Sequence, residues 1–169
     1  MLFRSALVRA NFDDDLDGAR DDNLRAIDAD PTDPHPWAQL AGVQTSCGEH
    51  DAACRSVAQS LRLSPLDPSL YVFESYAAMA HVAAGAYAAA VAFAQSSLRR
   101  NTMHLPTQRL LVGALWLAGR EGDSRAAAQQ YLALDPRGRT LTGLSRALQS
   151  KDAWQVSYAQ ALQQAGLAG

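Results

Sequence analysis

The chain has 169 residues, 48% of them apolar, and its acidic and basic side chains nearly balance, giving a formal net charge of −2. This length suits one domain with a buried core, and the balanced charge argues against nucleic-acid partners and membrane surfaces, which both attract basic clusters. Two cysteines are too few for a disulfide-built secreted scaffold, no apolar stretch is long enough to span a bilayer, and arginines interrupt the first residues, so we expect a cytoplasmic protein.

Helices are predicted along the whole chain. Alanine is abundant, glycine and proline separate stretches of helical length, and no alternating run of β-branched residues reaches the length of a strand. Asp33-Pro34 and Asp67-Pro68 are typical helix starts, because the carboxylate can cap free amides and proline lacks the amide that a first turn leaves unpaired. The predicted fold class is all-α.

The order of these signals predicts a repeat of two helices joined by a short turn. The first unit would place Leu16, Ala19 and Ile27 in its second helix and Pro31 after it, while its leading helix, residues 1–11, matches the pattern poorly. One domain, residues 1–169, is therefore divided into four units and a C-terminal capping hairpin: residues 1–33, 34–70, 71–104, 105–138 and 139–169.

The second unit is the clearest copy. Trp37, Leu40 and Ala41 take the large and small positions of a first helix, Gly48 lies at the turn, and Pro65 follows the second helix. This order matches the tetratricopeptide pattern of large, small, turn and closing residues. Small residues where two helices meet allow close packing. The sequence thus predicts a right-handed α-solenoid of tetratricopeptide type.

The third and fourth units continue the same register. Gly85 marks the turn of the third unit, Gly119 marks that of the fourth, and Pro136 closes the fourth. Residues 68–70 precede the register of the third unit, so they are predicted to lengthen its first helix by about one turn. A solenoid tolerates such variation, because each unit contacts mainly its neighbours.

Several segments resemble one bacterial group. The stretch Leu-Arg-Leu-Ser-Pro-Leu-Asp-Pro at 61–68 begins the likeness, and further segments continue it at 76–81, 84–87, 97–101, 114–120, 132–136, 141–144 and 162–167. They are similar to the tetratricopeptide-rich C-terminal regions of class III adenylate and guanylate cyclases and of related winged-helix regulators. The resemblance implies a sensory or scaffolding role in signalling and assigns no catalytic residue.

Cys47, His50 and Cys54 have a spacing that could supply three zinc ligands. In the repeat register Cys54 takes a buried apolar position, Cys47 precedes the turn glycine and His50 takes an aromatic-like position, so we interpret them as packing residues and predict no metal site. A reversible disulfide between the cysteines is a further alternative. His81 and His104 lack a neighbouring nucleophile motif and no phosphate loop is present, so neither enzymatic activity nor a cofactor is predicted.

The first helices of such units line the inner, concave face of the solenoid. The register places five candidate partner-binding residues there: His35, Ser75, Met79, Arg109 and Trp116. Together they would form a mildly apolar groove with one basic end, which suits an extended or helical segment of another protein. Met79 and Trp116 are equally compatible with the core, because apolar residues at helical spacing are usually buried.

These features predict a non-catalytic scaffold for protein–protein interaction, with a regulatory or signalling role. The partner would be a protein or peptide segment. A second hypothesis is a homodimer, because a poorly matched end helix must be covered by a cap or by another copy. A third is a domain that senses a small ligand in the groove.

Overall fold

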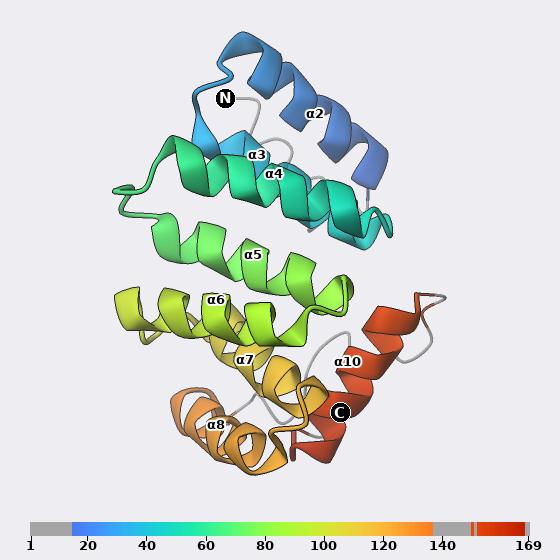
Figure 1. Ribbon diagram of the computed structural model, residues 1–169, viewed down its shortest axis with the longest axis vertical. Coiled ribbons are helices and arrows are strands. Elements are labelled where there is room, and N and C mark those ends of the chain that lie inside the picture. Colours follow the sequence, from blue (N-terminus) through green and yellow to red (C-terminus); the bar gives the residue numbers. More distant parts are fainter. Residues whose placement is uncertain (1–14, 137–149, 151, 168–169) are drawn as a thin grey trace.

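The computed structural model describes residues 15–136, 150 and 152–167. These residues form eight helices and no strand (Figure 1): α2 (Leu16–Ala29), α3 (Pro34–Ser46), α4 (His50–Leu63), α5 (Leu70–Ala83), α6 (Tyr87–Arg100), α7 (Leu105–Leu117), α8 (Glu121–Leu134) and α10 (Ala153–Gln164). The predicted leading helix at 1–11 and residues 139–149 of the predicted hairpin lie outside the described residues.

The helices pack as consecutive pairs, which confirms the predicted all-α solenoid. The pairs are α3 with α4, α5 with α6 and α7 with α8, and each pair also contacts the next. Gly48, Gly85 and Gly119 form the turns within the pairs with φ of 77°, 75° and 76°. A left-handed backbone is accessible to glycine at little steric cost, so these glycines allow each chain reversal.

Helix ends follow the sequence signals with one exception. The Asp33 carboxylate accepts the amide of His35 at 2.9 Å and caps α3, as predicted. The Asp67 carboxylate accepts the amide of Ser69 at 2.6 Å, but Pro68 and Ser69 lie in a turn and α5 begins at Leu70. The prediction of a first helix one turn longer in this unit was therefore wrong, because the Asp67 hydrogen bond belongs to the turn and not to the helix.

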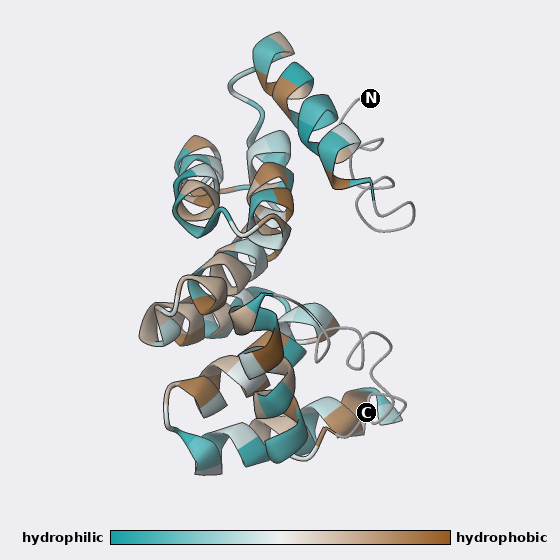
Figure 2. Ribbon diagram, turned by 90° about the vertical axis from the view of Figure 1, so that its right-hand side faces the viewer, coloured by the Kyte–Doolittle hydropathy of each residue, from teal (hydrophilic) through white to brown (hydrophobic). Residues whose placement is uncertain are grey.

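Small residues lie where neighbouring helices meet. Ala41, Ala53, Ala78 and Ala90 are all fully buried, as expected for close approach of two helices. α5 lies in the middle of the stack and is apolar on most of its surface, whereas α2, at the top of Figure 2, is largely hydrophilic. α5 therefore has neighbours on both sides, with α3 and α4 before it in the stack and α6 and α7 after it.

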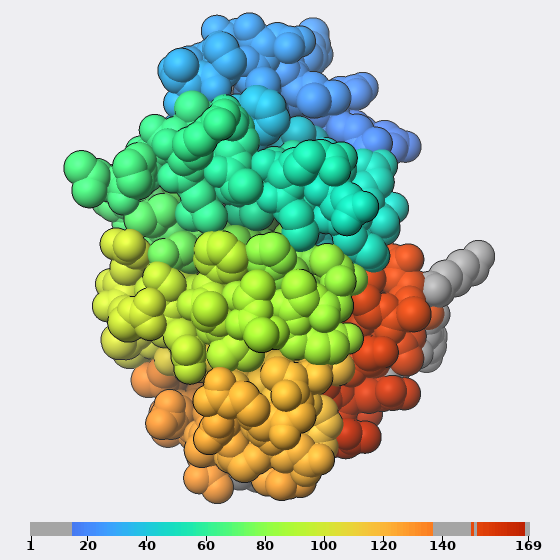
Figure 3. Space-filling model, viewed as in Figure 1, coloured from blue at the N-terminus to red at the C-terminus, as the bar shows by residue number. Residues whose placement is uncertain are grey.

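α10 does not extend the stack. It runs steeply beside α5 and α7 and packs against both (Figure 1), and Figure 3 shows it flush against the side of the stack. Its residues Ala159, Leu162 and the following Leu167 belong to the same core cluster as Val112 of α7. No helix within the described ranges combines the length and the apolar character needed to cross a membrane.

Candidate functional site

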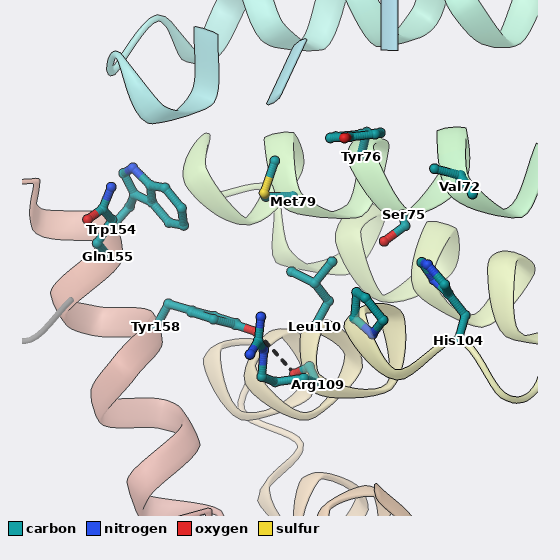
Figure 4. A pocket seen from close by; sticks show the side chains of 11 residues that line it. Val72, Ser75, Tyr76, Met79, His104, Arg109, Leu110, Trp154, Gln155 and Tyr158 are labelled. Atoms are coloured by element: carbon teal, nitrogen blue, oxygen red, sulfur yellow. Dashed lines mark hydrogen bonds between the residues drawn. The ribbon is translucent and has the colours of Figure 1, made fainter. Parts of the chain in front are cut away.

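A pocket of about 540 Å³ lies between α5, α7 and α10 (Figure 4). Within each helix the lining residues recur about every three or four positions, so they come from one face. They are Val72, Ser75, Tyr76 and Met79 of α5, His104, Pro106, Arg109 and Leu110 at and after the start of α7, and Trp154, Gln155 and Tyr158 of α10. Most of the lining is aromatic or aliphatic, as is usual for ligand sites.

Tyr158 connects α10 to α7. Its hydroxyl donates a hydrogen bond to the Arg109 carbonyl at 3.1 Å. Its ring lies against Gly113, where an added Cβ would stand 2.2 Å from Tyr158 Cε2. Burial raises the pKa of Tyr158 to about 12, so the hydroxyl keeps the proton that it donates. The missing side chain at Gly113 therefore decides how closely α10 approaches, and with it the third wall of the pocket.

Arg109 is the one charged residue among the described lining residues. Figure 4 shows its guanidinium next to the Tyr158 hydroxyl, where its charge partly offsets the rise in the pKa of Tyr158. In the described part of the chain, arginines 20, 100, 120 and 125 pair with acidic side chains, whereas Arg109 has no such partner. The pocket thus presents one uncompensated positive charge.

A chain of hydrogen bonds orients His104. Ser97 donates to the Tyr71 carbonyl at 2.7 Å, and its oxygen lies 3.1 Å from Thr107 Oγ1, which lies 2.6 Å from His104 Nδ1. Because the proton of Ser97 is already used, Thr107 donates to Ser97, and His104 donates through Nδ1 to Thr107. Burial lowers the pKa of His104, which favours the neutral ring. Neutral His104 therefore keeps Nε2 as a hydrogen-bond acceptor.

The structure brings three of the five predicted site residues together: Ser75, Met79 and Arg109 line this pocket. Trp116 and His35 lie outside its lining. The Arg125 guanidinium covers the Trp116 ring at 4.9 Å from its centroid. His35 contacts Asp33 at 2.9 Å and packs edge-on against Phe73, with ring centroids 5.1 Å apart.

The sequence did not predict that α10 forms the third wall of the pocket. Trp154 and Tyr158 are four positions apart and could have been recognised as an aromatic face of a C-terminal helix. The sequence assigns this helix to the capping hairpin at 139–169 but does not place it against α5 and α7, because its position depends on contacts with units far away in sequence. Glycine at 113, inside a helix, was the other available signal of a close approach.

Cys47, His50 and Cys54, considered above as zinc ligands, have different surroundings. Cys54 Sγ is 3.6 Å from His81 Nδ1, His50 packs edge-on against Trp154, and Cys47 is exposed. Burial raises the pKa of Cys54 and lowers the pKa of His81, which favours the neutral form of both groups. Both cysteines are free, and the residues that the structure describes contain no group of three His, Cys, Asp or Glu side chains that could hold a metal ion.

Comparison with known proteins gives matches among solved structures. A scan of protein-family models and a search of curated proteins found no match. TTC0263, a thermophilic tetratricopeptide protein of Thermus thermophilus, superposes with a TM-score of 0.71 at 21% identity, over 96% of this chain and 97% of that chain. MamA superposes with a TM-score of 0.64 at 19% identity, over 90% of each chain.

A third match is YrrB, described as a tetratricopeptide protein with an unusual peptide-binding site. It superposes with a TM-score of 0.62 at 12% identity, over 97% of this chain and 82% of that chain. At these identities the likeness concerns the fold alone. Together with the paired helices described above, the matches show that this chain has the tetratricopeptide-repeat fold.

Proposed function

We propose that this chain is a non-catalytic scaffold that binds a segment of another protein in the pocket between α5, α7 and α10. The observation that carries the proposal is the pocket itself, whose apolar walls surround one uncompensated cation. The two walls from α5 and α7 belong to helices that pack against their neighbours in the stack, which favours recognition because a preformed wall loses little order on binding. YrrB provides an example of peptide binding by this fold.

The pocket chemistry favours binding over catalysis. Ser75 is the lining residue that could act as a nucleophile, but in the described structure its hydroxyl has no hydrogen bond to a histidine or carboxylate that could serve as a general base. His104, the histidine of the lining, has no hydrogen bond to Ser75 among the described contacts, and its Nδ1 contacts Thr107. We therefore propose that Ser75 contributes a hydrogen bond to a bound segment.

A regulatory or signalling role is the more specific form of the proposal. It is supported by the resemblance of residues 61–68 and the later segments to the C-terminal regions of class III cyclases and winged-helix regulators. In such a setting the pocket would position an effector segment and would itself perform no reaction.

Two alternatives have an observation in their favour. The pocket volume of about 540 Å³ also fits a small molecule, since such sites span about 300 to 1,000 Å³. Leu66 and Met103, at the turns between units, are 94% and 62% exposed and could form part of a dimer contact. Multi-angle light scattering of the purified chain distinguishes a monomeric scaffold from a homodimer.

The proposed function can be tested with a display library of random twelve-residue peptides selected on the full chain. Met79→Gln places a neutral polar amide in the apolar wall, so binding of the selected peptides should weaken roughly tenfold. Met103→Gln is the matched control, because Met103 is exposed at a turn outside the pocket. Fluorescence anisotropy measures both. Equal binding of all selected peptides to wild type and Met79→Gln would exclude the pocket as the partner site.

A further inference from the structure

We infer that the segment bound in this pocket carries a side-chain carboxylate next to a flat apolar side chain, with the carboxylate on Arg109. This inference rests on the proposed function and specifies the chemistry of the partner. Arg109 has no acidic partner in the described part of the chain, and the other pocket walls are uncharged at neutral pH. A negatively charged group on the bound segment therefore complements the charge of the pocket.

The surroundings of Arg109 favour the binding of a carboxylate. Its backbone carbonyl already accepts from Tyr158, and the guanidinium lies beside the hydroxyl oxygen of the same tyrosine (Figure 4). Arg109 is half-buried, so a carboxylate would be attracted more strongly than at an open surface. A neutral partner would leave this half-buried cation without a counter-charge.

The remaining walls fit a flat apolar side chain. Tyr76, Met79, Leu110 and Tyr158 line the same pocket, and Trp154 lines it from α10 (Figure 4). Aromatic rings and a methionine thioether favour an aromatic occupant through ring packing and sulfur contacts. The volume of about 540 Å³ leaves room for such a ring together with an adjacent residue.

The two ends of the pocket give the bound segment a direction. Trp154 and Gln155 lie on one side of Figure 4, and Ser75 and His104 lie on the other, with Arg109 between them. Neutral His104 offers Nε2 as an acceptor, so the part of the segment beyond the carboxylate would present a backbone amide or hydroxyl donor there.

The experiment uses the same twelve-residue library selected on the full chain. The selected sequences should share an aromatic residue beside Asp or Glu. For a resynthesised peptide, Arg109→Gln should weaken binding about tenfold, replacing the peptide's Asp by Asn should weaken binding to wild type by a similar factor, and combining both changes should cost little more. Arg109→Lys, which keeps the charge, should retain part of the affinity.

Arg99→Gln is the matched control, because Arg99 is an exposed arginine of α6 outside the pocket. Thermal unfolding of each variant verifies that it is folded. Two results would overturn this inference and leave the proposed function standing: selected peptides that bind the Met79→Gln variant weakly but bind the Arg109→Gln variant with wild-type affinity, or selected peptides that lack acidic residues. If no selected peptide depends on Met79, the proposed function fails, and this inference with it.

Discussion

At the scale of single residues, the pocket depends on the size of Gly113. The Tyr158 ring occupies the space that a side chain at position 113 would fill, and its hydroxyl then reaches the Arg109 carbonyl. Glycine inside a helix costs about 1 kcal/mol relative to alanine, so its presence in α7 lowers the intrinsic stability of that helix. The compensating gain is the docking of α10.

Gly113→Ala is expected to destabilise the protein even though alanine favours helices. The new methyl group would meet Tyr158 Cε2 at 2.2 Å and Cδ2 at 2.6 Å, so the ring must move and its hydrogen bond to Arg109 must break. Overpacking of this kind costs about 1–3 kcal/mol, which exceeds the gain in propensity. Urea denaturation measures the change in the free energy of unfolding.

Gly122→Ala in α8 is the control for this variant, because a Cβ there meets nothing within 4 Å. It should leave stability unchanged or raise it by up to about 1 kcal/mol. If the urea midpoint of the Gly113→Ala variant equals that of the wild type, Tyr158 does not pack on α7 as described.

At the scale of helices, buried serines at equivalent places in two second helices differ in their partners. Ser97 of α6 donates to the Tyr71 carbonyl of α5 and contacts Thr107 of α7, so it ties three helices together. Ser60 of α4 is equally buried, but its hydroxyl has no hydrogen-bond partner among the described residues. The two positions therefore form a natural comparison of a satisfied and an unsatisfied hydroxyl.

Ser97→Ala is expected to cost about 1–2 kcal/mol, because it removes the hydrogen bond to the Tyr71 carbonyl and leaves the buried Thr107 hydroxyl without an acceptor for its proton. Ser60→Ala removes an unpaired polar atom and should be neutral or stabilising. Chemical denaturation of the two variants in parallel gives the comparison. Equal losses from both changes would contradict the hydrogen-bond pattern described for α5, α6 and α7.

At the scale of the whole molecule, two half-buried histidines couple folding to pH. His81 stacks on Phe93 and His104 lies at the pocket, and burial lowers the pKa of both. Their pKa in the unfolded chain is near the ordinary value of about 6.5. Between the lowered folded value and 6.5 the unfolded chain binds more protons, so stability rises with pH in that window.

Thermal unfolding should therefore occur at a lower temperature at pH 5.5 than at pH 7.5. The stability supplied by the neutral histidines is complete above the unfolded pKa and is lost as the pH falls toward the folded values. The double variant His81→Gln and His104→Gln should show a smaller difference between the two pH values. An identical pH dependence for wild type and variant would assign the effect to other groups.

The sequence by itself determined the class of the fold and its repeat. Helix caps, turn glycines and buried alanines are local signals, because they depend on backbone geometry and on contacts between adjacent helices. Asp33, Gly48 and Ala41 each have the predicted place in the structure. The same register also placed Ser75, Met79 and Arg109 on one face, and in the structure these three line the same pocket, since first helices in consecutive units present equivalent faces.

Only the tertiary structure decided what completes the pocket. Residues far apart in the chain meet there, with Tyr158 contacting position 109 across 49 residues, and no repeat period encodes such a contact. The tertiary structure also decided which side chains are covered and which are paired. The Arg125 guanidinium covers the Trp116 ring, whereas Arg109 faces the pocket and has no acidic partner among the described residues. Local patterning specifies helices and their neighbours, whereas the docking of α10 depends on the shape of the finished stack.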